Sequence, residues 1–172
     1  MLSLGSTIGS FGRGDAAGFL GRFAQCVQGE SRGDGGGSGS VLLAVDGYKD
    51  GERVWRAYND VEGLNEKFIA NALEHANRIL KYEAFKEEDW MVKGEWNAES
   101  GSHDWYYIPL KDVVVEGTQF SKGERVAAVK SYKYDGIDRL KLYKAAGVEE
   151  INAWELYGKD YGELNYSRFV FY

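Results

Sequence analysis

The spacing of apolar residues predicts that the chain starts with a strand and then a helix. Leu2 and Leu4 alternate with polar neighbours, which predicts a strand over residues 1–4. Residues 15–27 carry apolar side chains at helical spacing, with Asp15 as the expected N-cap. Glycines between these segments favour a tight strand-to-helix turn, which is typical of an α/β domain.

A continuous apolar run follows this helix. The segment "SVLLAVDG", residues 40–47, has the pattern of a strand buried on both faces of a parallel sheet. Strand, helix and strand together predict a right-handed βαβ crossover. The stretch 29–40 between the helix and the second strand is rich in Gly and Ser and is predicted to be a mobile loop.

Two more helices are predicted in the middle of the chain. The segment "GERVWRAYND" reads as a short helix that ends near Tyr58. Residues 64–80 form the clearest helix in the sequence, because their apolar residues make one stripe. This stripe consists of Leu64, Phe68, Ile69, Ala72, Leu73, Ala76 and Leu80.

The pattern then changes to strands. "WMVKGEWNA", "DWYYIPL", "DVVVEG" and "ERVAAVKSYKY" are rich in aromatic and β-branched residues, and Gly101 and Gly123 are placed in the turns between them. "IDRLKLYKAAG" returns to helical spacing with Gly147 as its C-cap. The chain closes with "VEEINAWEL" and "NYSRFVFY", which predict two strands joined as a hairpin.

Composition narrows the class of protein. The 172 residues are 44% hydrophobic, enough for one core. The net charge of -6 argues against a nucleic-acid partner, which needs a basic face. Cys26 is the only cysteine in the sequence, so no internal disulfide is expected and a reduced, cytoplasmic setting fits best. No apolar run approaches about 20 residues, so no membrane span is expected.

The predicted sheet looks incomplete. A doubly wound sheet buries both faces and usually has five or more strands, whereas only two parallel strands are predicted here. The strand at residues 1–4 is expected to lack a neighbour on one side. The sequence therefore looks like the second half of an α/β domain, and its exposed edge predicts self-association.

Three separated blocks carry a resemblance to a known family. "SLGSTIGSF", "RAYNDVEGLNEKFIANALEHANRIL" and "GERVAAVKSYKYD" resemble the histidine-specific type of S-adenosylmethionine (SAM)-dependent methyltransferase, from Met1 to about Gly147. Fungal members methylate histidine or dimethylallyltryptophan, and this sequence is most similar to the second branch. The resemblance implies a partial Rossmann-like class I methyltransferase fold, of the α/β class, with an inserted helical and β-rich substrate-binding region. It also implies SAM as cofactor and an amino acid as substrate.

The family pattern offers an explanation for the opening strand. In the family, "LGSTIGNF" ends the fourth strand of the sheet, after the Gly-rich SAM loop and the ribose-binding acid. No E-x-G-x-G pattern occurs near the N-terminus here. We therefore expect a C-terminal half that binds SAM weakly, through truncation, a gene-model error or a degenerate copy. The alternative is a non-catalytic relative that binds a small molecule or pairs with a full-length protein.

The resemblance also implies a division of the chain. Residues 1–58 correspond to the second half of the Rossmann-like core, including the loop 29–40. Residues 59–134 correspond to the substrate-binding helix and strands. Residues 135–172 correspond to a C-terminal helix and an antiparallel strand pair that complete the sheet.

Three polar residues are implied as substrate-binding residues. Ser10 stands where the family has an Asn that binds the amino-acid group, and a hydroxyl makes fewer such contacts than an amide. Tyr58 matches a tyrosine that contacts the substrate's carboxylate region. Ser131 and Lys133 match the late substrate-binding strand, and alternation puts both on the face of Val129.

Two apolar positions bear on substrate choice. The histidine enzymes have a Glu where Val129 stands, and a valine does not hold an imidazole. Trp105 matches a position on a neighbouring strand that could wall the same pocket. A tryptophan-derived substrate is therefore favoured over histidine, with simple core packing of Trp105 as the other interpretation.

No catalytic residue is expected, because methyl transfer to an amine depends mainly on alignment and on excluding water. The cofactor-binding residues stay unassigned. His75 and His103 have no metal-ligand spacing and are interpreted as ordinary surface or packing residues, so no metal site is expected.

Overall fold

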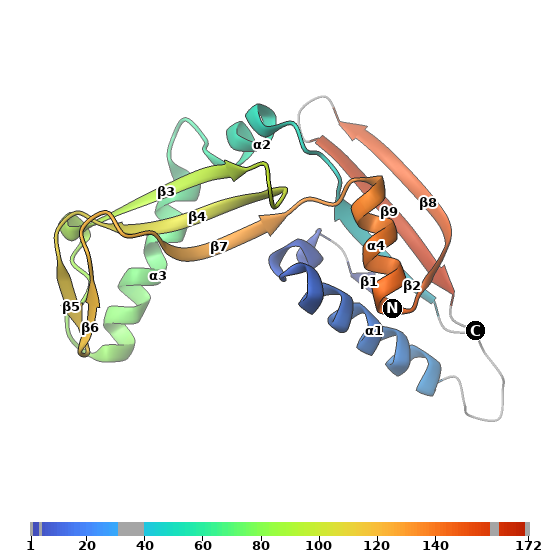
Figure 1. The fold of residues 1–172 in the computed structure, drawn as a ribbon, viewed down its shortest axis with the longest axis horizontal. Coiled ribbons are helices and arrows are strands. Elements are labelled where there is room, and N and C mark those ends of the chain that lie inside the picture. The colour runs from blue at the N-terminus through green and yellow to red at the C-terminus, as the bar shows by residue number, and fades with distance from the viewer. Residues whose placement is uncertain (1, 4, 31–39, 159–161, 171–172) are drawn as a thin grey trace. The chain divides into compact units, whose positions relative to one another are not determined.

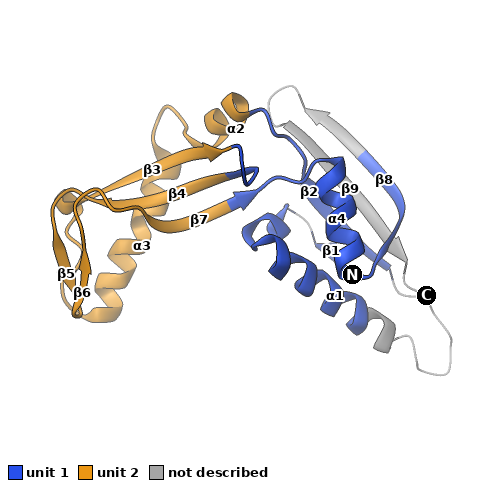
Figure 2. Cartoon of the chain, viewed as in Figure 1, with its two compact units in different colours: residues 1–50, 98–102, 131–172 blue, residues 51–97, 103–130 orange. Residues whose placement is uncertain are grey.

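A computed structural model describes residues 2–3, 5–30, 40–158 and 162–170. Contacts divide the chain into two compact units (Figure 2). Residues 1–50, 98–102 and 131–172 make the first unit, and residues 51–97 and 103–130 make the second. The predicted mobile loop falls mostly on residues 31–39, which lie outside the described residues.

The first unit is built on a four-stranded sheet (Figure 1). Its strands lie in the order β1 (Leu2–Ser3), β2 (Ser40–Asp46), β9 (Gly162–Val170) and β8 (Glu149–Gly158). As predicted, β1 and β2 are parallel, with Leu2 opposite Leu42, and β8 and β9 form an antiparallel hairpin. The hairpin returns through β9, which pairs antiparallel with β2.

Helix α1 (Arg13–Glu30) connects β1 to β2 and packs with α4 (Gly136–Ala146). Ile8, Leu20, Leu43 and Tyr134 are each at most 1% exposed and belong to one apolar cluster. Burying an aliphatic side chain of this size contributes about 1.5–3 kcal/mol to stability. The continuous apolar run in β2 is thus explained, because Val41, Leu43, Ala44 and Val45 are all buried.

Two helix boundaries test the predicted caps. Asp15 is not the N-cap of α1, because the helix already begins at Arg13 and Asp15 lies in its first turn. There its carboxylate still faces the positive end of the helix dipole. Gly147 is the C-cap of α4 as predicted, with φ 66°, while Asp135 caps the other end by accepting a hydrogen bond from Asp138 N.

The second unit begins with two helices, α2 (Gly51–Tyr58) and α3 (Leu64–Leu80), at the bounds that the sequence predicts. The apolar stripe of α3 is buried only in part. Ile69 is 7% exposed, whereas Phe68 is 72% and Leu64 is 58% exposed. The helix packs along β3 (Trp90–Asn97), and Tyr107 donates a hydrogen bond to the carbonyl oxygen of Ile69 at 2.8 Å.

A three-stranded sheet and a small strand pair complete this unit. The sheet has the order β3, β4 (Ser102–Pro109) and β7 (Val126–Tyr132). The first residue of β4, Ser102, and the last two of β7, Ser131 and Tyr132, are counted with the first unit. Strand β5 (Val113–Val115) pairs with β6 (Thr118–Phe120), a strand that the sequence pattern did not predict.

The remaining bounds are those of two short 3-10 helices, η1 (Thr7–Ser10) and η2 (Glu87–Asp89). The compact units divide after residue 50 and after residue 130, so α2 belongs with the second unit. The functional division at residues 58 and 134 stays a prediction. So does self-association, although β1 lies at an edge among the strands that are described.

Candidate functional site

The first group of candidate residues lies where β1 ends. Because β1 and β2 are parallel, their carboxyl ends lie at the same edge of the sheet, which is where ligands bind in open α/β folds. Gly5 and Ser6 follow β1 with φ of 73° and 55°, and η1 comes next. Ser10 is the last residue of η1 and its side chain is exposed.

A glycine brings this loop against the end of β7. A Cβ atom on Gly9 would lie 2.6 Å from the carbonyl oxygen of Tyr132, closer than real Cβ contacts come. The Gly in "STIGS" is therefore needed for the approach. Ser10 follows Gly9 and Ser131 precedes Tyr132, so two predicted site residues come from segments that touch.

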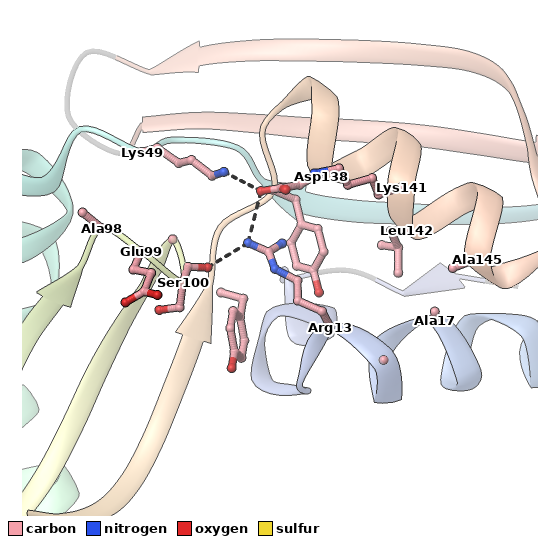
Figure 3. Close-up of a pocket in the computed structure, with 14 residues that line it drawn as sticks. Arg13, Ala17, Lys49, Ala98, Glu99, Ser100, Asp138, Lys141, Leu142 and Ala145 are labelled. Atoms are coloured by element: carbon pink, nitrogen blue, oxygen red, sulfur yellow. Dashed lines mark hydrogen bonds and ion pairs between the residues drawn. The ribbon is translucent and has the colours of Figure 1, made fainter.

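An ion-pair cluster, made of Arg13, Lys49, Asp135 and Asp138, lies in the same unit and was not predicted. Figure 3 shows three of its members, Arg13, Lys49 and Asp138. The Arg13 guanidinium pairs with Asp138 at 3.1 Å, and Lys49 pairs with Asp135 at 2.8 Å and also with Asp138. Burial alone lowers the pKa of Lys49, but its hydrogen bonds to both aspartates raise the pKa above its usual value.

Arg13 also joins backbone segments. Its Nη2 donates to the carbonyl oxygens of Ser100 at 3.1 Å and Lys133 at 2.9 Å. The guanidinium lies 4.3 Å from the ring centroid of Tyr134, a cation–π contact. Arg13, Ser100 and Tyr134 line a cavity of about 660 Å³. The charges of the cluster are paired with one another. We therefore interpret the cluster as a structural link between α1, α4 and the backbone at Ser100 and Lys133, rather than as a binding site.

Lys133 does not lie on the strand face that was predicted for it. Strand β7 ends at Tyr132, and Lys133 is 3% exposed, with its ammonium paired to the carboxylate of Asp46 at the end of β2. The same carboxylate accepts a hydrogen bond from Tyr48 N at 3.1 Å. Lys133 therefore joins β7 to β2, and its charge is committed within the protein.

The second group of candidate residues is an aromatic cluster in the second unit, made of Tyr58, His103 and Trp105. The rings of Tyr58 and His103 are stacked, with centroids 4.5 Å apart and planes 13° apart. His103 meets Trp105 edge to face at 5.3 Å. Tyr58 and Trp105, two of the substrate contacts that the resemblance implies, are thus joined through a histidine.

His103 packs in the interior, as one of the two interpretations of it expected, and it is fully buried. Its Nε2 lies 2.9 Å from Nδ2 of Asn59. An amide nitrogen donates, so Nε2 of the ring is the acceptor of this hydrogen bond in the tautomer that carries its proton on Nδ1. No sequence spacing connects His103 to Tyr58, so only its aromatic neighbours on β4 hinted at such packing. His75, by contrast, lies exposed on α3.

Val129 and Trp105 share a face of the three-stranded sheet. Lys130 pairs with the buried carboxylate of Asp104 at 3.2 Å, so these two side chains lie on one face. Because successive residues of a strand alternate between faces, Val129 and Trp105 lie on the other. Val129 is 41% exposed, so its isopropyl group is accessible there.

Metal-ligand clusters and membrane-spanning helices are both absent from the described residues. No cluster of three or more His, Cys, Asp or Glu that could hold a metal ion occurs among them. Within the same part of the chain, none of the helices is long and apolar enough to cross a membrane.

Comparison with known proteins gives a consistent result. A family model described as histidine-specific methyltransferase, SAM-dependent, matches residues 1–167. Ergothioneine biosynthesis protein 1 of Neurospora crassa is 38% identical over 164 residues, which cover 94% of this chain and 18% of that protein. 4-Dimethylallyltryptophan N-methyltransferase easF of Epichloe festucae var. lolii is 34% identical over 178 residues, covering 93% and 50%.

Two further matches have the same character. N-methyltransferase imqF of Aspergillus flavus is 31% identical over 166 residues, covering 94% of this chain and 44% of that protein. A SAM-dependent methyltransferase structure from Clostridium acetobutylicum matches with a TM-score of 0.41 at 8% identity, covering 96% of this chain and 55% of that one. The chain spans half or less of the length of the curated relatives named here.

Proposed function

Because this chain belongs to the histidine-specific, SAM-dependent methyltransferase family, we propose that it carries the acceptor-binding part of an amino-acid N-methyltransferase. The relatives that it matches include N-methyltransferases named for dimethylallyltryptophan. In this family SAM supplies the methyl group. The part of the protein that binds the acceptor has to orient its amine and exclude water.

We further propose that the acceptor is derived from tryptophan rather than being histidine. The observation that carries this proposal is the shared sheet face of Trp105 and Val129, next to the stacked rings of Tyr58 and His103. An apolar and aromatic surface rewards the burial of an indole. A valine gives a buried imidazole N–H no acceptor, and an unmade hydrogen bond of that kind costs about 1–3 kcal/mol.

The polar ends of the acceptor are assigned to the remaining candidates. In the first unit, Ser10 and Ser131 are the residues that the resemblance assigns to the amino-acid group. In the second unit, Tyr58 is the residue that it assigns to the carboxylate region. The exposed side chain of Ser10 at the carboxyl edge of the sheet supports its role. A stacked, fixed phenol ring supports the role of Tyr58, because a pre-oriented group loses little entropy on binding.

The end of β2 offers no uncommitted acid for the ribose of SAM. A ribose is normally held by an acid at the end of a strand of the sheet. Here the acid that ends β2, Asp46, is already bonded to Lys133 and to Tyr48 N. No step is therefore assigned to residues of this chain through the cofactor. The second candidate function is that of a non-catalytic relative that binds the acceptor without transferring methyl groups.

One experiment separates these functions. The chain is incubated with SAM and either 4-dimethylallyltryptophan, tryptophan or histidine, and methylated products are measured by mass spectrometry. Acceptor binding is measured in parallel by calorimetry. Product formation supports the enzyme, and acceptor binding without product supports the non-catalytic relative. If none of the three amino acids binds, both proposals are wrong.

A further inference from the structure

A second cavity in the second unit has walls of an unusual kind. It measures about 540 Å³, and Trp55, Trp96 and Trp105 are among its lining residues. Three of the five tryptophans of the chain therefore line one cavity. We call it the three-indole pocket. Of its residues, only Trp105 was among the predicted substrate contacts.

The three rings are held in fixed positions. Trp55 is 46% exposed, yet its Nε1 donates a hydrogen bond to the carbonyl oxygen of Gly94 at 3.2 Å. Trp96 packs so closely on Gly51 that a Cβ there would clash with its ring. Trp105 is 3% exposed and would lie 3.0 Å from a Cβ on Gly94. The pocket is therefore preorganised, with one indole kept exposed to solvent.

The charged groups of the pocket favour a cation. Its lining contains Glu66, Glu95 and Lys93, which together carry one net negative charge. Glu95 is paired with Lys93 at 2.6 Å and with Arg125 at 2.8 Å, so its charge is balanced within the sheet. Glu66, an exposed residue in the first turn of α3, supplies a second carboxylate to the lining.

From these observations we propose that the three-indole pocket binds a methylated ammonium group. The faces of indole rings attract cations, and tryptophan does so best among the aromatic residues. A quaternary ammonium suits such walls better than a primary one, because its methyl groups bury apolar surface and it has no N–H that needs an acceptor. The exposed carboxylate of Glu66 adds attraction at low salt.

This inference goes beyond the proposed function, because it needs neither the cofactor nor methyl transfer. Two sources share the ligand chemistry. One is an N-methylated amino acid, which the proposed reaction would make, and the other is a simple cation of the choline type. The residues of the pocket all belong to the second unit, so the site is complete within one compact body.

The test compares choline with 3,3-dimethylbutan-1-ol, which has the same shape but carbon in place of the charged nitrogen. The 172-residue chain is titrated with each, and the indole N–H resonances are followed by NMR. We expect choline to shift the resonances of Trp55 and Trp96 saturably and to bind about 5- to 30-fold more tightly than the alcohol. Equal affinity for the two compounds would overturn the proposal.

Variants locate the site. Trp55→Leu is expected to weaken choline binding at least about 5-fold, and Trp55→Phe to weaken it less, because a smaller ring retains part of the attraction. Trp154→Leu is the matched control, since Trp154 is 50% exposed but lies on β8 in the first unit. Unchanged affinity in Trp55→Leu, with the Trp154 resonance in its native position, would contradict the assignment.

Charge and ligand source are tested separately. Glu66→Gln is expected to weaken choline binding about 2- to 5-fold at low salt, whereas Glu62→Gln, an exposed change outside the lining, leaves it unchanged. N,N,N-Trimethyl-L-tryptophan forms a third arm. Tighter binding than choline supports a methylated amino acid as the source, and weaker binding supports a simple cation. A failed methyl-transfer assay leaves choline binding intact, so the two proposals fail independently.

Discussion

The imidazole of His103 lies parallel to the phenol ring of Tyr58, with 4.5 Å between the ring centroids and 13° between the planes. This stack joins the end of α2 to the first residues of β4. Because Asn59, the next residue, also bonds to the same imidazole, the end of α2 is held at two points. A proposed substrate contact, Tyr58, thus depends for its position on a residue that has no predicted role.

Replacing His103 tests this dependence. His103→Ala is expected to lower the free energy of unfolding by about 2–4 kcal/mol, as for other large-to-small core changes. His103→Phe keeps a stacked ring but removes the acceptor for Asn59, and is expected to cost about 1–3 kcal/mol. Urea unfolding measures both. The control His75→Ala, at an exposed position, should change stability by less than about 0.5 kcal/mol.

Gly9→Ala is expected to separate the η1 loop from the end of β7. The added methyl group meets the backbone oxygen of Tyr132 at 2.6 Å, so the loop has to move, at a cost of about 1–3 kcal/mol. The matched control is Gly14→Ala in α1, where nothing lies within 4 Å and alanine should stabilise by about 0.5–1 kcal/mol. If both variants unfold at the same temperature, the close approach of residue 9 to Tyr132 does not require a glycine.

The ion-pair cluster predicts a contribution to stability that is lost at low pH. Hydrogen bonds from Lys49 and from the backbone of Asp138 lower the pKa of Asp135. A carboxyl whose pKa is lower in the folded state stabilises the protein above its unfolded pKa of about 3.9, and this contribution disappears as the pH falls through the folded pKa.

The corresponding variant is Asp135→Asn. Above pH 4 it should be less stable than the parent protein, and the difference should shrink steadily below pH 4, because the parent alone loses the ionised form. Asp50→Asn serves as the control, because Asp50 is an acidic residue outside the ion-pair cluster. A difference between variant and parent that is constant from pH 7 to pH 2 would argue against the cluster as its cause.

Val129→Glu is expected to shift acceptor preference toward histidine. A carboxylate on the sheet face that carries Trp105 gives an imidazole N–H a charged acceptor. Such a hydrogen bond is worth about 1.5–3 kcal/mol, or roughly 10- to 150-fold in the ratio of affinities. Calorimetric titration of both variants with L-tryptophan and L-histidine measures the ratio. Val114→Glu, at a 68% exposed position on β5, is the control. An unchanged ratio would show that Val129 lies outside the acceptor site.

The sequence by itself determined the kinds of elements and their order. The apolar run of β2, the spacing in α3, the turn at Gly101 and the cap at Gly147 were all readable, because each depends on residues within a few positions of one another. The blocks of family resemblance likewise needed no structure. Strand β6 escaped notice because three residues with one aromatic side chain give too short a pattern.

Only the tertiary structure decided which distant residues meet. The pairing of Arg13 with Asp138, the stack of Tyr58 on His103 and the gathering of three tryptophans around Gly94 all join segments that are far apart in the chain. Exposure was also decided there, since Phe68 and Ile69 are neighbours in one predicted stripe but only Ile69 is buried. Periodicity records which side chains share a face, and the packing of one face against another depends on chain topology, which local spacing does not encode.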